Sequence, residues 1–83
     1  ADILFFETSS NIHKVILHAK DRQIEFFSTI KELSNTLGSD FVRCHRSFLV
    51  NKKNIKEVDT KNRIIYFTNG ETCLMSTRMM KRL

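Results

Sequence analysis

Apolar and polar residues alternate with a period of two along most of this chain. Successive side chains of a strand point to opposite faces, so this alternation is typical of antiparallel sheets with one buried face. Polar segments such as the turn Lys20-Asp21-Arg22 separate the alternating runs. The strands that we expect span residues 3–8, 13–19, 23–28, 41–44, 55–59, 63–67 and 72–76. Residues 47–55 fit either a continued strand or a short helical turn.

A helical period replaces this alternation in one segment. Thr29 and Glu32 stand three residues apart, as in a capping box, where the first side chain accepts a hydrogen bond from a free backbone N–H. Gly38 is expected to end the helix after about two and a half turns. The apolar residues that share one face of this helix are Ile30, Leu33 and Leu37.

Two tight turns are predicted in the second half of the chain. Residues 60–62 join two strands as a hairpin, and Asn69-Gly70 predicts a type I′ turn before the last strand. The pattern therefore predicts a mainly β fold, with antiparallel strands in small packed sheets and one short helix.

Composition agrees with one folded domain. Of the 83 residues, 41% are hydrophobic and seven are Phe, which is enough for a core and too much for a disordered chain. We expect most of these phenylalanines in the core, whereas exposed ones would serve as stacking platforms for single-stranded nucleic acid. No apolar run approaches the roughly 18 residues of a membrane span, and no signal peptide is recognisable, so no membrane partner is expected.

Positive charge is in excess and unevenly distributed. Fourteen Lys and Arg against nine Asp and Glu give a net charge of +5 and favour a polyanionic partner. Five of the cations lie between Arg43 and Lys56, a stretch without a single acid, and three more lie in residues 76–83. Two basic blocks predict a directed electrostatic field, which net charge alone does not.

Catalytic chemistry is not recognisable, so we expect neither an enzyme nor a cofactor. Two glycines, Gly38 and Gly70, cannot build a phosphate-binding loop. Cys44 and His45 are adjacent, so in a strand they would point to opposite faces. Spacings typical of metal sites are missing, and no metal is expected among the candidate ligands His13, His18, Cys44, His45 and Cys73.

The two cysteines fit a reducing cytoplasm better than a disulfide framework. Cations flank Cys44 on both sides and would lower the pKa of its thiol if it were exposed, whereas a buried thiol would be inert. Cys44 and Cys73 are therefore redox candidates, and a disulfide between them would require Cα atoms within about 7 Å.

Residues 41–51, FVRCHRSFLVN, combine an apolar side for a core with cations that cannot all be buried unpaired. Arg43 is expected to pair with Asp40 or Glu57. Arg46 is expected where the chain leaves the strand, free to contact a guanine edge or a phosphate. Asn51 is expected to bond its own backbone at the strand exit.

The order Arg-x-His-x-Ser-x-x-Val-Asn in this segment resembles the signature of the LytTR family, DNA-binding output domains of bacterial response regulators. DILFFE at residues 2–7 and IKEL at 30–33 resemble the family's first motif and its helix. MSTR at residues 75–78 is similar to the V-S-R motif that ends the family's domain, with one residue inserted between Ser and Arg. Within the family, residues 5–7, 22–26 and 43–45 are most similar to quorum-sensing accessory gene regulators, which carry Asn at the position of Arg46.

The resemblance implies sequence-specific binding of double-stranded DNA by loops and strand ends, with bending of the duplex. The implied base contacts are His13, Arg46 and Arg78. The implied backbone contacts are Ser10, Asn11, Lys14, His45, Ser47, Lys52, Lys53, Ser76, Lys81 and Arg82. For His45 and Ser47, hydrogen bonds that shape the turn are an equal alternative.

The resemblance also implies a larger system. Residues 1–83 would form a single DNA-binding domain that lacks the family's first strand, with a receiver domain upstream and a sensor histidine kinase as partner. Direct-repeat promoter sites would bind a second copy head to tail, in the cytoplasm. The alternatives from other classes are an RNA or single-strand binding module and a basic domain that docks an acidic protein.

Overall fold

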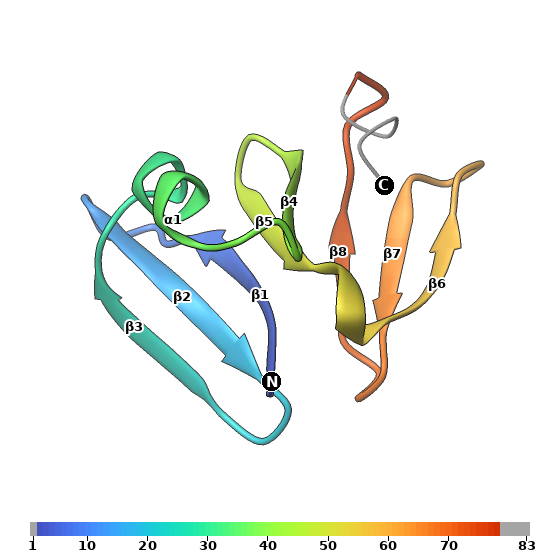
Figure 1. The fold of residues 1–83 in the computed structure, drawn as a ribbon, viewed down its shortest axis with the longest axis horizontal. Coiled ribbons are helices and arrows are strands. Elements are labelled where there is room, and N and C mark those ends of the chain that lie inside the picture. Colours follow the sequence, from blue (N-terminus) through green and yellow to red (C-terminus); the bar gives the residue numbers. More distant parts are fainter. Residues whose placement is uncertain (1, 79–83) are drawn as a thin grey trace.

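The computed structural model describes residues 2–78 and contains two antiparallel sheets with one short helix (Figure 1). This confirms the predicted fold class. The larger sheet has the strand order β3-β2-β1-β5-β4, and the smaller has the order β6-β7-β8. The elements are β1 Ile3–Thr8, β2 Lys14–Ala19, β3 Gln23–Phe27, α1 Ile30–Thr36, β4 Phe41–His45, β5 Phe48–Asn51, the 3-10 helix η1 Lys52–Asn54, β6 Ile55–Asp59, β7 Ile64–Phe67 and β8 Thr72–Leu74.

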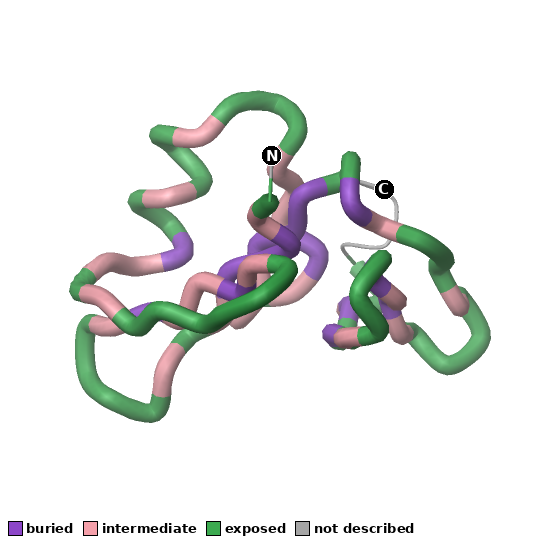
Figure 2. Tube along the Cα trace, turned by 90° about the horizontal axis from the view of Figure 1, so that it is seen from below, coloured by how far each residue is buried: buried purple, intermediate pink, exposed green. Residues whose placement is uncertain are grey.

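The two faces of the five-stranded sheet are covered by different layers, because neighbouring residues of each strand face opposite sides. Phe6 and Leu49 pack with Ile30 of α1 on one face. Their neighbours Phe5 and Val50 pack on the other face, in one cluster with residues of β7 and β8. Buried positions therefore concentrate toward the middle of the molecule, with exposed loops around them (Figure 2).

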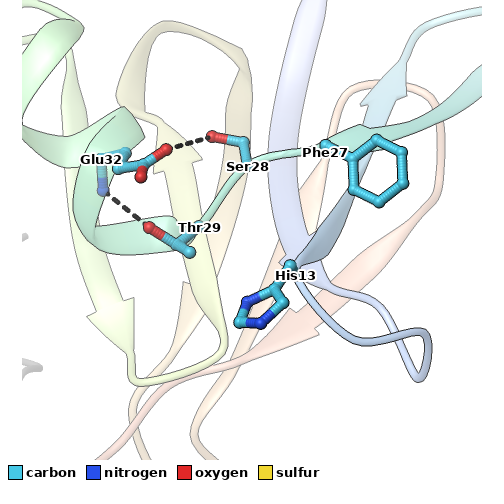
Figure 3. Close-up of a pocket in the computed structure, with 5 residues that line it drawn as sticks. All are labelled: His13, Phe27, Ser28, Thr29 and Glu32. Carbon is cyan, nitrogen blue, oxygen red and sulfur yellow. Dashed lines mark hydrogen bonds between the residues drawn. The ribbon is translucent and has the colours of Figure 1, made fainter.

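Helix α1 begins and ends where the sequence predicts, between Thr29 and Gly38. Thr29 is the N-cap, and its Oγ1 accepts a hydrogen bond from the backbone N–H of Glu32 at 3.1 Å. The Glu32 carboxylate accepts a further hydrogen bond from Ser28 Oγ at 3.4 Å, just before the cap (Figure 3). The helix ends at an extended Leu37, with φ −81°, and Gly38 has no left-handed φ. The glycine therefore follows the helix end without forming a left-handed cap.

The ambiguous segment 47–55 resolves into strand β5 followed by η1. Asn51 caps η1, because its Oδ1 accepts from the N–H of Lys53 at 3.1 Å, which confirms its structural role. Its Nδ2 donates to the carbonyl of Ile3 at 2.9 Å, and Asn54 Nδ2 donates to the same carbonyl at 2.8 Å. The two buried amides thus tie the chain after β5 to the start of β1.

The hairpin between β7 and β8 forms as predicted, with a different turn. The N–H of Gly70 donates to the carbonyl of Phe67 at 3.0 Å, and Gly70 has a φ of 93°. Neither central residue of this turn, Thr68 or Asn69, has a positive φ, which a type I′ turn requires at both. The left-handed conformation falls on the glycine after the turn. Within residues 2–78, no helix is long and apolar enough to cross a membrane.

Candidate nucleic-acid interface

Three exposed segments lie toward the upper part of the view in Figure 1: the β1–β2 loop at the left, the β4–β5 turn at the centre and the chain after β8 at the right. The β1–β2 loop adjoins the β4–β5 turn, because the N–H of Thr8 donates to the carbonyl of Ser47 at 2.9 Å. The chain after β8 runs beside β4, because the N–H of Ser76 donates to the carbonyl of Cys44 at 2.8 Å. The structure therefore brings to one end the three predicted base-contact residues, all exposed: His13, Arg46 and Arg78.

Glu25 on β3 organises the β1–β2 loop, and sequence analysis assigned it no role. Its carboxylate accepts hydrogen bonds from Ser9 Oγ and from Asn11 Nδ2, the latter at 3.0 and 3.2 Å to its two oxygens. Lys14 Nζ lies 3.7 Å from the same carboxylate. The hydrogen bonds from Ser9 and Asn11 hold the pKa of Glu25 below its ordinary value. Two of the predicted phosphate contacts, Asn11 and Lys14, therefore face Glu25 in the free domain, while Ser10 is exposed.

His13 has a left-handed backbone, with φ 62°, which costs a residue with a Cβ roughly 1–2 kcal/mol. Its carbonyl is held by the N–H of Ser28, at 2.9 Å, so the backbone is anchored while the imidazole stays exposed. The side chain lines an open cavity of about 250 Å³ beside the start of α1 (Figure 3). The other lining residues are Phe27, Ser28, Thr29 and Glu32.

Two side chains shape the β4–β5 turn from within. Arg43 Nη2 donates to the carbonyl of Arg46 at 3.0 Å, and His45 Nδ1 accepts from the N–H of Ser47 at 3.1 Å. The expected pairing of Arg43 with Asp40 or Glu57 is wrong: within residues 2–78 Arg43 forms no ion pair with either acid. Arg43 instead fixes the turn that presents Arg46, and its own Nε is buried with no hydrogen-bond partner.

The remaining predicted backbone contacts lie elsewhere. Lys52 and Lys53 are in η1, at the other end of β5 from Arg46, roughly 20 Å away along an extended chain. Lys53 Nζ forms an exposed ion pair with Asp40 at 3.2 Å. Ser76 lies in the segment that meets β4. Lys81 and Arg82 lie outside the described residues.

The cysteines are buried together between the sheets. Cys44 is 0% exposed and Cys73 is 3% exposed, and Cys44 Sγ donates to the carbonyl of Leu74 at 3.4 Å. A hydrogen bond from the Cys73 thiol lowers the pKa of Cys44, against the opposing effect of burial. The same hydrogen bond and burial raise the pKa of Cys73. The thiol partner, rather than the flanking cations, is therefore the first cause of the shift at Cys44.

The aromatic side chains are poor stacking platforms. Phe5, Phe6 and Phe67 are buried, and three others are half-buried against the two clusters. Phe27 is the exposed one of the seven, at 75%, and Lys14 Nζ sits 4.7 Å from its ring centroid. This confirms that the phenylalanines are mainly core residues.

Comparison with known proteins identifies the same fold and family. The profile of the LytTr DNA-binding domain matches residues 1–83. Accessory gene regulator protein A of Staphylococcus epidermidis (strain ATCC 35984) is 49% identical over 82 residues, and that of Staphylococcus aureus (strain N315) is 50% identical. Both alignments cover 99% of this chain and 34% of the relative, so the chain spans about a third of those proteins.

A solved structure agrees. The LytTr DNA-binding domain of a response regulator from Bacillus cereus superposes with a TM-score of 0.85 at 26% sequence identity. The superposition covers 96% of this chain and 75% of that one.

Proposed function

This chain belongs to the LytTr DNA-binding domain family, and on that premise we propose that it binds double-stranded DNA sequence-specifically as the output domain of a quorum-sensing-type transcriptional regulator. A DNA-binding family also agrees with the prediction that the chain is not an enzyme. The sequence identity of 49–50% to accessory gene regulator proteins supports the regulatory role.

The observation that carries this proposal is the meeting of three exposed loops at one end of the five-stranded sheet. Arg46 offers five N–H donors in a planar fork, which suits the two acceptors of a guanine edge in the major groove. Arg78 offers the same fork from the segment after β8, and His13 offers an imidazole from the β1–β2 loop. Three base contacts from separate loops suit reading of successive major grooves better than they suit insertion of one recognition helix into a single groove.

The DNA backbone is bound in this proposal by neighbours of the base-contact residues. Ser10, His45, Ser47 and Ser76 flank the three loops, and the lysines and Arg82 add charge that neutralises phosphates. Asn11 and Lys14 would exchange Glu25 for phosphate when DNA arrives. Contacts spread over two grooves favour a bent duplex, at a cost of a few kcal/mol on elastic estimates.

The proposed partners follow from the regulatory role. They are direct-repeat promoter sites in the cytoplasm, a second copy of the domain on adjacent DNA, an upstream receiver domain and a sensor histidine kinase. The low exposure of the phenylalanines speaks against the single-strand alternative, which needs aromatic platforms.

Selection of bound duplexes from a random library tests the proposal most directly. We expect one enriched motif, followed by competition in which unlabelled duplex, but not the same sequence as a single strand, displaces the probe. Recovery of unenriched sequences, or equal competition by single strands, would overturn sequence-specific duplex binding.

A further inference from the structure

His18 on β2 bridges the two sheets through both of its ring nitrogens. Its Nε2 lies 2.6 Å from Glu7 Oε1 on β1, and its Nδ1 lies 2.9 Å from Glu71 Oε1, just before β8. The His18 side chain is 8% exposed, and its ring stacks on Phe5, with centroids 4.2 Å apart and planes 14° apart. Glu71 is itself held, because its Oε2 accepts from Asn69 Nδ2 at 2.7 Å.

Two carboxylate oxygens at hydrogen-bond distance make a specific demand on the ring. A neutral imidazole has one N–H, so one of the two carboxylates would face a nitrogen lone pair at hydrogen-bond distance. When both carboxyl groups are ionised, both contacts are satisfied by an imidazolium that donates from each nitrogen. The groups that face this ring are the carboxylates of Glu7 and Glu71. The Cys73 thiol lies near Glu7, whose negative charge contributes to raising the pKa of that thiol.

The bridge differs in kind from the rest of the contact between the sheets. The sheets otherwise meet mainly through apolar side chains, among them Leu4, Val50, Ile65 and Phe67. Apolar burial is not directional, whereas charge-assisted hydrogen bonds require a defined distance and angle. His18 therefore adds a charge-assisted, directional contact between two sheets that are otherwise joined by the apolar core and by neutral hydrogen bonds, such as the one from Ser76 N–H to the Cys44 carbonyl.

That orientation matters because the predicted base contacts are divided between the sheets. His13 and Arg46 lie on connections of the five-stranded sheet, while Arg78 follows β8 of the three-stranded sheet. A small rotation of one sheet against the other would move Arg78 relative to the other two. Displacements of about 1 Å are enough to disturb bidentate contacts.

We propose that His18, clamped between Glu7 and Glu71, is a positioning residue for DNA recognition that holds Arg78 in register with His13 and Arg46. The inference rests on the proposed function. It assigns His18 no contact with DNA, and it predicts that the clamp contributes to the specific complex rather than to the general attraction between a basic domain and phosphates.

The central test compares His18→Gln and Glu71→Gln with the wild-type domain by fluorescence anisotropy, on the selected duplex and on a random duplex. We expect each variant to lose about five- to tenfold in affinity for the selected duplex and to bind the random duplex like wild type. The matched control is Asp40→Asn, which removes the Lys53–Asp40 ion pair and one negative charge, and should therefore strengthen binding to both duplexes alike. Loss of equal size on both duplexes, or no loss, would overturn the inference.

A double-mutant cycle separates positioning from general loosening. In the Arg78→Ala background, His18→Gln should have almost no further effect, because the residue it positions is gone. An undiminished effect in that background would show that His18 does not act through Arg78. Circular dichroism melting, with binding measured well below the transition, keeps loss of fold distinct from loss of register.

The protonation state is read independently of DNA. Nitrogen-15 NMR of the His18 ring at neutral pH should show both nitrogens protonated in the wild type, and Glu71→Gln should weaken that state. A neutral ring would overturn the clamp even if DNA binding is specific. If no duplex is selected at all, the proposed function fails, and the NMR result still decides whether the clamp exists.

Discussion

The two ends of strand β5 carry cations of the same charge in different settings. At the start, Arg46 sits in an exposed turn whose backbone is held by Arg43 and His45, beside the loop of His13. At the other end, Lys53 is paired with Asp40, and Lys52 is exposed on a short 3-10 helix. The sequence does not distinguish these two ends, because Arg46, Lys52 and Lys53 all belong to the same basic block of residues 43–56.

The comparison shows that placement, rather than charge, separates candidate base contacts from general attraction. The Arg46 end gathers side chains from three distant parts of the chain around fixed backbone. The Lys52 end offers point charges that suit phosphates at any sequence. Each of the following changes tests whether the two ends differ in this way.

The largest effect is expected at the Arg46 end. Arg46→Ala and Arg78→Ala should each weaken binding to the selected duplex by about 1–3 kcal/mol and leave the fold intact, because both side chains are exposed. Fluorescence anisotropy on selected and random duplexes measures the difference. Equal loss on both would mean that the two arginines contact phosphates alone.

A smaller change in DNA affinity is expected for Glu25→Ala, with opposite signs on the selected and the random duplex. Release of Ser9, Asn11 and Lys14 should loosen the loop of His13 and weaken specific binding. Loss of a negative charge should strengthen binding to a random duplex. The matched control is Asp59→Ala, since Asp59 caps the β6–β7 turn in the same manner by accepting from Asn62 at 2.9 and 3.0 Å. Equal changes in DNA affinity for the two variants would show that Glu25 does not organise the β1–β2 loop for specific binding.

The Glu25 contacts should also depend on pH. The pKa of this carboxyl is held below its ordinary value of 4.5, so its hydrogen bonds favour the ordered loop at neutral pH. They are lost as the pH falls through the lowered pKa, because protonation removes the charge that Asn11 and Lys14 contact. Amide shifts of the β1–β2 loop, followed by NMR at acidic pH, should move together with the Glu25 carboxyl. Independent titration would contradict the coupling.

Oxidation of the cysteine pair is expected to act slowly. Peroxide should weaken DNA binding through Cys44, by modification or by linkage to Cys73, but only at the rate at which the buried site opens. Mass-spectrometric labelling follows Cys44 while anisotropy follows binding. Loss of binding with Cys44 unmodified would exclude this route.

The smallest effect is expected at the Lys52 end. The wild-type domain should show a log–log salt slope near roughly −4 to −5. Lys52→Ala and Lys53→Ala should each reduce the steepness by about one or less and weaken selected and random duplexes alike. A larger loss on the selected duplex would place these lysines on the base-reading surface and erase the difference between the ends.

Much of the fold was readable from the chain because it depends on neighbours in sequence. The cap at Thr29, the alternation of β2 and the hairpin at Asn69-Gly70 follow from side-chain period and turn chemistry over a few residues. The exposed turn at Arg46 is local in the same sense. The turn type around Gly70 was mispredicted, since it depends on hydrogen bonds formed in the folded chain.

The sequence by itself determined the elements, the family resemblance and the basic segments of this protein. Only the tertiary structure decided which cations share a surface, that Arg43 holds a turn carbonyl rather than an acid, and that His18 lies between Glu7 and Glu71. The reason is separation along the chain. His18 and Glu71 are 53 residues apart, and no local pattern encodes a contact formed when two sheets pack.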